Sequence, residues 1–199
     1  MNNLRVRLIV IFTLGAMFIT NAQAYGLEKY RLKENLTYIP YSGFSSASIE
    51  QFNDALYTWN KELPDGPKMK RSTKTHDSSP EVIEKDGKNF IYRLPEFDSN
   101  SNYVAANRIV SKSDGLGKTK RVVESDINFD VNKKFANSGK TGCYDVQTVF
   151  LHEAGHTLGL KDIKSPTKAV MYYKATTGKE RRSLSADDKN GLSDAYDLD

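Results

Sequence analysis

The sequence HEAGHTLGLKD, residues 152–162, decides the fold of this chain. Two histidines spaced four residues apart, His152 and His156, lie on one face of a helix and can bind the same zinc ion. Glu153 lies between them and is placed to act on a metal-bound water rather than on the metal itself. This part of the motif predicts a helix that carries both metal ligands and a general base.

The second half of the motif predicts how a third ligand reaches the metal. Gly159 can adopt the positive φ that ends a helix. The chain then turns back and can bring Asp162 to the same ion. Two nitrogens and one carboxylate oxygen leave the fourth zinc position open, which is typical of catalytic zinc sites rather than structural ones.

The residues around the motif favour a helix, whereas the alternative interpretation is a surface helix with two unrelated histidines. Asp145 is a suitable N-cap because its carboxylate can accept the first free backbone N–H groups. Apolar residues recur at helical spacing before, within and after the motif: Val146, Val149, Phe150, Ala154, Leu158 and Leu160. The combined signature favours one catalytic zinc ion.

The extended motif resembles that of the metzincin metalloproteases, HExxHxxGxxH followed by a methionine turn. Asp162 replaces the last histidine, as in the snapalysin-type metzincins. The resemblance implies a zinc metalloendopeptidase. The added negative charge predicts a weaker Lewis acid than a three-histidine site.

Two further motifs resemble the matrixin branch of that clan. Residues 169–172, AVMY, are similar to its Met-turn, which implies that Met171 lies beneath the zinc; the alternative is an ordinary core residue. Tyr172 and Tyr173 are both candidates to assist catalysis, and a pocket wall is the alternative for either. Residues 184–188, LSADD, resemble the start of the C-terminal helix.

The local chemistry of this last motif predicts a helix start. Ser185 is a suitable N-cap, and Asp188 completes a capping box. The resemblance implies that Asp187 and Asp188 tie this helix to the Met-turn or to the mature N-terminus. Simple capping is the alternative.

Residues 1–24 are predicted to be a secretory signal peptide, followed by one metalloprotease domain over residues 25–199. Arg5 and Arg7 precede an apolar run, and Ala22-Gln23-Ala24 is a suitable cleavage site. We therefore expect a protein secreted to the periplasm or the medium, with no membrane anchor. About ten residues separate Tyr25 from the first predicted strand, too few for an inhibitory prodomain, so we expect activity on export.

Charge and cysteine content exclude other classes of protein. Loss of Arg5 and Arg7 with the signal peptide lowers the formal charge from +4 to about +2, too little to indicate a nucleic-acid partner. Cys143 is the only cysteine, so an intramolecular disulfide is excluded. We expect it to be a small buried residue before the active-site helix. The charged cluster at residues 179–182 is expected to be a solvated loop.

The remaining chain predicts an α/β (α+β) domain. Strands are expected at Leu36–Ile39, Phe90–Leu94, Tyr103–Ser111 and Arg121–Phe129. A helix capped by Ser46 or Ser48 should run to Trp59. The resemblance implies a zincin-like fold with a twisted mixed sheet, an active-site helix, a Met-turn and a C-terminal helix. It also implies that Arg121–Phe129 borders the substrate cleft, and we expect the substrate to pair with an edge strand there.

A second metal site is not assignable from the sequence. Besides the two motif histidines there is only His76, which lies in a polar stretch and is expected to be exposed. Calcium remains possible because Asp114, Asp126 and Asp130 offer oxygen ligands. Their spacing matches no motif, so solvated surface acids are the default interpretation.

The sequence thus predicts a secreted zinc endopeptidase that acts on protein or peptide substrates, with Glu153 as general base. Any restraint on its activity would come from an external protein inhibitor. Two alternatives remain. One is a metzincin-fold binding or toxin module without catalysis, against which the intact Glu153 argues. The other is a zinc hydrolase of cell-wall peptides.

Overall fold

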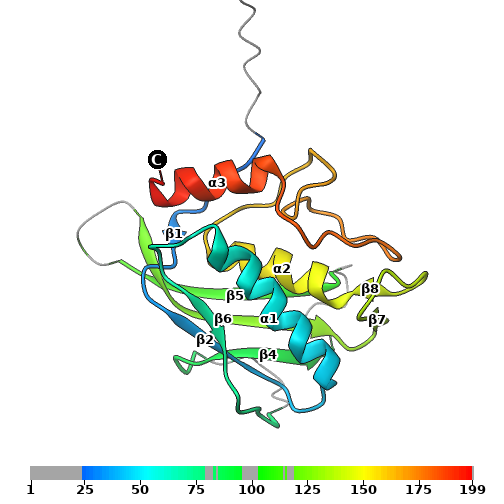
Figure 1. The fold of residues 1–199 in the computed structure, drawn as a ribbon. Coiled ribbons are helices and arrows are strands. Elements are labelled where there is room, and N and C mark those ends of the chain that lie inside the picture. Colours follow the sequence, from blue (N-terminus) through cyan, green and yellow to red (C-terminus); the bar gives the residue numbers. More distant parts are fainter. Residues whose placement is uncertain are drawn as a thin grey trace, which may run out of the picture.

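A twisted six-stranded sheet with two helices on one face forms the body of the protein (Figure 1). The computed structural model describes residues 24–78, 83, 85–95, 103–113, 115 and 119–198. The strands are β1 (Tyr30–Arg31), β2 (Leu36–Pro40), β3 (Met69–Arg71), β4 (Asn89–Leu94), β5 (Ala105–Lys112) and β6 (Lys120–Asp130). A separate pair consists of β7 (Phe135–Ala136) and β8 (Tyr144–Asp145). The α/β fold with a mixed sheet is therefore confirmed.

The strand order places β5 at the edge of the sheet. The main path runs β1-β6-β4-β2-β3, with all of these pairs parallel. Strand β5 pairs with β6 in antiparallel fashion along almost its whole length and with no other described strand. The expectation that Arg121–Phe129 is the edge strand beside the substrate is wrong, because that segment is β6, an interior strand paired with β1, β4 and β5. Alternating residues identify a strand but not its neighbours.

The described residues also form three helices: α1 (Ser46–Lys61), α2 (Val146–Thr157) and α3 (Ala186–Tyr196). Helices α1 and α2 lie side by side over the sheet, and α3 crosses one end of the domain (Figure 1). The N-cap of α1 is Ser45, not Ser46 or Ser48 as predicted, because its side chain accepts a hydrogen bond from the Ser48 N–H at 3.1 Å. The Asp145 cap and the Ser185–Asp188 capping box are confirmed.

The core between helices and sheet is rich in aromatic side chains. Phe52 and Trp59 of α1, Phe150 of α2, and Tyr38 and Phe129 of the sheet have no measurable exposure. Phe52 and Phe150 have ring centroids 4.6 Å apart. Burial of large aromatic rings contributes strongly to stability, so α2 is held firmly against both α1 and the sheet.

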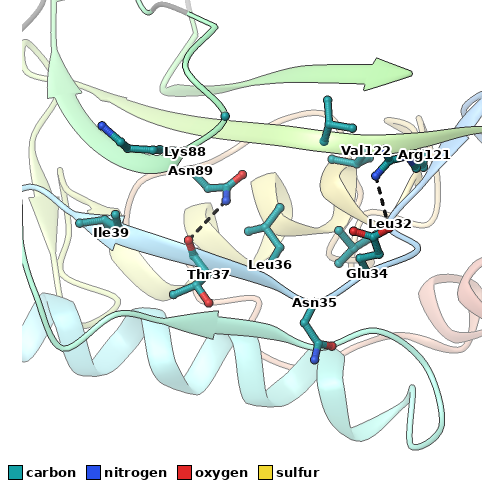
Figure 2. Close-up of a pocket in the computed structure, with 12 residues that line it drawn as sticks. Leu32, Glu34, Asn35, Leu36, Thr37, Ile39, Lys88, Asn89, Arg121 and Val122 are labelled. Atoms are coloured by element: carbon teal, nitrogen blue, oxygen red, sulfur yellow. Dashed lines mark hydrogen bonds and ion pairs between the residues drawn. The ribbon is translucent and has the colours of Figure 1, made fainter. Parts of the chain in front are cut away.

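A cavity of about 360 Å³ lies between strands β2 and β6 of the sheet (Figure 2). Strands β1 and β4 share one edge of β6 at different registers, and the cavity occupies the gap between them beside Val122 and Val123. Asn89, at the start of β4, links β6 to β2 beside this cavity: its side-chain oxygen accepts from the Ser125 N–H at 2.9 Å, and its amide donates to the Thr37 carbonyl at 3.4 Å. None of the cavity's lining residues belongs to the 152–162 motif.

Some of the predictions concern residues that the structure does not describe. These include residues 1–23 of the predicted signal peptide and most of the connection between β5 and β6. Within the part that is described, no helix has the length and hydropathy needed to cross a membrane.

Candidate metal centre

The two histidines of α2 present their Nε2 atoms on the same side of the helix. The Nδ1 of His152 lies 2.8 Å from the Val170 carbonyl, and the Nδ1 of His156 lies 2.8 Å from the Leu160 carbonyl. A carbonyl oxygen can only accept, so each Nδ1 carries the proton. Nε2 is then the nitrogen that faces Asp162, the arrangement found in metal-binding histidines whose other nitrogen is held by an outer partner.

Asp162 converges on both of these nitrogens. Its Oδ1 lies 3.1 Å from His152 Nε2 and 3.7 Å from His156 Nε2. The hydrogen bond from His152 lowers the pKa of Asp162, although its burial acts in the opposite direction. Burial disfavours the charged form of His152, but the bond to Asp162 and the charge of Glu153 outweigh it and raise the pKa of His152. Asp162 is therefore an anion at neutral pH.

The three donor atoms fit the dimensions of a zinc site. Ligands at 2.0–2.1 Å in tetrahedral geometry lie about 3.3 Å apart, and the two measured separations of 3.1 and 3.7 Å lie on either side of this value. All three donors lie within 4.8 Å of one another. Among the described residues, no other set of three or more histidine, cysteine or acidic side chains converges in this way.

The turn after α2 brings the third donor into place. Gly159 has φ +90°, as expected for the residue that ends the helix, and a Cβ there would lie 2.4 Å from the Tyr30 carbonyl. The next residue, Leu160, supplies the carbonyl that holds His156. Glu153 belongs to the same helix and is 7% exposed, so this acidic residue is largely buried.

The predicted Met-turn packs against α2 and is connected to α3 through Asp188. The Asp188 carboxylate accepts from the backbone N–H groups of Val170 (2.9 Å) and Met171 (3.0 Å). The Val170 carbonyl in turn holds His152. Asp187 instead accepts from the backbone N–H of Ala24 at 3.1 Å. Both aspartates therefore do more than cap α3: one binds the Met-turn and the other the N-terminal segment.

Gly155, between the two histidines, has a role that was not anticipated. A Cβ at this position would lie 2.4 Å from Met171 Sδ and 2.9 Å from the Trp59 ring. Met171 and Trp59 are both buried, so they pack directly onto the backbone of α2. A glycine inside a helix usually lowers the stability of that helix. Its presence in the motif was therefore the sequence signal that another side chain packs closely against the helix backbone here.

We expect Gly155→Ala to lower the stability of the domain. Alanine gains about 1 kcal/mol in helix propensity, but overpacking a filled core costs roughly 1–3 kcal/mol. The Trp59 ring cannot yield easily, because its Nε1 donates to the Leu151 carbonyl at 2.8 Å. Chemical denaturation of wild type and variant measures the difference. A variant as stable as wild type would show that Met171 can move aside without cost.

Two arginines organise the loop between the Met-turn and α3. The expectation of a solvated loop at 179–182 is confirmed for Lys179 and Glu180, which are exposed, but is wrong for Arg181 and Arg182, which are partly buried. Nη2 of Arg181 donates to the Lys174 carbonyl at 2.7 Å, and its guanidinium lies 5.4 Å from the centroid of the Tyr172 ring. Arg182 binds the buried carboxylate of Asp145 at the start of α2. Tyr172 is therefore held by Arg181, whereas Tyr173 is 55% exposed. A run of charges does not reveal such long-range partners.

Four other residues lie in environments that differ from the predicted ones. His76 is partly buried, with its ring against Phe90 and Tyr92, because a small apolar cluster forms on the outer face of the sheet. Cys143 is only half-buried. Asp126 and Asp130 are buried rather than solvated.

The calcium candidates do not share a site in the described structure. Asp126 accepts from the Phe90 N–H at 2.9 Å and pairs with Arg108, whereas Asp130 accepts from the Asn132 N–H. Asp114 lies outside the described residues. Calcium binding by these residues stays unassigned.

A comparison with protein families agrees with this arrangement. The family model described as matrixin matches residues 45–197. None of the curated proteins matches the sequence. A solved structure, metalloproteinase-II from Bacteroides fragilis, is 16% identical, with a TM-score of 0.44 over 84% of this chain and 54% of that one. This chain thus spans about half the length of that protein.

Proposed function

The chain belongs to the matrixin family, and on that premise we propose that it is a secreted zinc-dependent endopeptidase with Glu153 as its general base. The observation that carries the proposal is the convergence of His152, His156 and Asp162, with the Nδ1 of each histidine held by a backbone carbonyl so that its Nε2 faces Asp162. These three side chains would hold the zinc ion. A binding module would need the ligands but not the buried acid beside them.

Glu153 would perform the proton transfers of the reaction. A zinc ion, when bound, supplies Lewis-acid polarisation of the scissile carbonyl and lowers the pKa of water towards about 7. Glu153 accepts the proton of the attacking water and later delivers it to the leaving amine. Its low exposure supports this role, because a carboxylate shielded from bulk water keeps the proton for the reacting atoms.

The substrate would lie extended beside the edge strand β5 and pair with it by β-addition. Two observations support this placement. Among the described strands, β5 pairs with β6 alone and so lies at the edge of the sheet. It also lies next to α2, because Asn107 of β5 donates a hydrogen bond to the Glu153 carbonyl. Tyr172 and Tyr173 would wall the pocket for the side chain that follows the scissile bond.

An assay with two substrates tests this function. Protein recovered after secretion, with its N-terminus sequenced, is incubated with an unfolded protein and in parallel with purified cell wall. We expect Tyr25 at the N-terminus and cleavage of the unfolded protein that stops on chelation and returns with zinc. Cleavage of cell wall alone would favour the cell-wall hydrolase. No cleavage of either would favour the binding module.

A further inference from the structure

A buried hydrogen-bond network joins the active-site helix α2 to strands β2 and β6 of the sheet. The hydroxyl of Tyr38 (β2) lies 2.9 Å from Ser125 Oγ (β6) and 2.7 Å from Thr157 Oγ1 (α2). Ser125 Oγ and Thr157 Oγ1 lie 2.8 Å apart. These three side chains are essentially unexposed. Polar groups withdrawn from water in this way are costly unless all are paired, so such networks hold one geometry.

Asn107 connects this network to the edge strand. Its amide nitrogen donates to the Glu153 carbonyl at 2.7 Å and to Thr157 Oγ1 at 2.8 Å, and its oxygen accepts from Ser125 Oγ at 2.9 Å. Rotating the amide by half a turn would set its oxygen against the Glu153 carbonyl oxygen, so the observed orientation is the one that satisfies every partner.

Asn107 therefore spans the two parts that must be aligned for hydrolysis. It belongs to β5, beside which the substrate would pair, and it contacts the main chain of the residue that carries the proposed base. The side chain of Asn107 points to the helix face of the sheet, because its register partner Ile127 lies in the core beneath α2. The neighbouring Arg108 pairs with Asp126 on the opposite face.

We infer that Asn107 is a positioning residue that sets the distance between the substrate strand and the carboxylate of Glu153. The inference rests on the proposed function. Displacing a reacting group by about 1 Å can cost 10²-fold in rate, and within the described part of the chain the amide of Asn107 supplies the hydrogen bond that joins β5 to Glu153. The effect should therefore fall on kcat, with substrate pairing along β5 and zinc binding retained.

Two replacements of Asn107 and one control separate positioning from simple stabilisation. Asn107→Leu keeps the size of the side chain without its polar atoms, and Asn107→Ser is too short to reach Glu153. Tyr38→Phe is the control, because it removes a hydroxyl from the same network but touches neither β5 nor Glu153. All three variants should melt at a lower temperature than wild type. Only the Asn107 variants should alter the geometry of the reaction.

The measurements are kcat, KM, zinc content, melting temperature and amide hydrogen exchange of the metal-free proteins. We expect both Asn107 variants to lose roughly ten- to hundredfold in kcat with KM within about twofold of wild type and full zinc content. Their β5 amides should exchange faster. Tyr38→Phe should keep kcat within about twofold and leave β5 exchange unchanged.

Two results would overturn the inference alone: an Asn107 variant with wild-type kcat, or a Tyr38→Phe protein that loses as much kcat as the Asn107 variants at a similar melting temperature. A wild-type protein without zinc-dependent peptidase activity would overturn the proposed function and the inference with it. Because the wild type is assayed first, the two failures are distinguishable.

Discussion

Replacing Glu153 by glutamine is expected to reduce peptide hydrolysis by a factor of order 10² or more while zinc stays bound. General acid–base groups contribute typically 10²- to 10⁴-fold, and glutamine cannot accept the proton of the attacking water. The exchange is nearly isosteric and leaves the His152, His156 and Asp162 donors unchanged. Since Glu153 is 7% exposed, a neutral side chain also avoids burying a charge, so the fold should not weaken.

Turnover, zinc content and melting temperature of the Glu153→Gln protein check this expectation together. Glu50→Gln, an exposed residue of α1, is the matched control for the same chemical change and should keep wild-type turnover. Near-normal turnover in Glu153→Gln with zinc bound would show that another group is the base. A loss of zinc together with activity would instead assign Glu153 to the metal shell.

The segments that the sequence predicted well are those in which several local signals coincide. Helix α2 has a capping aspartate, a continuous apolar pattern and a terminating glycine, and all three occur where they were expected. The capping box of α3 is equally local. The two-residue strands β1, β7 and β8 were missed, since so short a segment has no periodicity to detect.

Contacts between segments that are distant in the chain could not be predicted from the sequence. The long strand β6 was recognised, but its interior position depends on β1, β4 and β5, which lie far from it in the chain. Arg181, Arg182 and Asn107 were overlooked for the same reason. Each binds backbone or carboxylate groups from another element, and an isolated polar residue carries no sign of such a partner.

Within the metal site, too, the local features were predictable from the sequence and the long-range contacts were not. The spacing of His152 and His156 predicts their common face, and the helix rise makes this almost independent of tertiary structure. The carbonyls that select their tautomers belong to Val170, in the Met-turn, and to Leu160, in the turn after the helix. The first of these depends on Asp188 of α3, so the chemistry of His152 is set partly by the C-terminal helix.

Asp162→Ala is expected to lower zinc affinity by more than about 10²-fold, because losing a partner outside the ligand shell already costs 10- to 100-fold. The side chain of Asp162 is 54% exposed, so its removal should change the stability of the metal-free fold little. Asp65→Ala, at another exposed aspartate, is the matched control and should bind zinc as wild type does. Zinc affinity is measured by competition with a chelator.

Asp162→His is the decisive companion to the alanine variant. Histidine restores the ligand set HExxHxxGxxH and supplies a neutral nitrogen donor where the carboxylate was. We expect it to retain zinc and to be active, and the lost negative charge should make the metal a stronger Lewis acid. If Asp162→Ala bound zinc with wild-type affinity, Asp162 would not be a ligand, and its 3.1 Å approach to His152 Nε2 would be an ordinary ion pair.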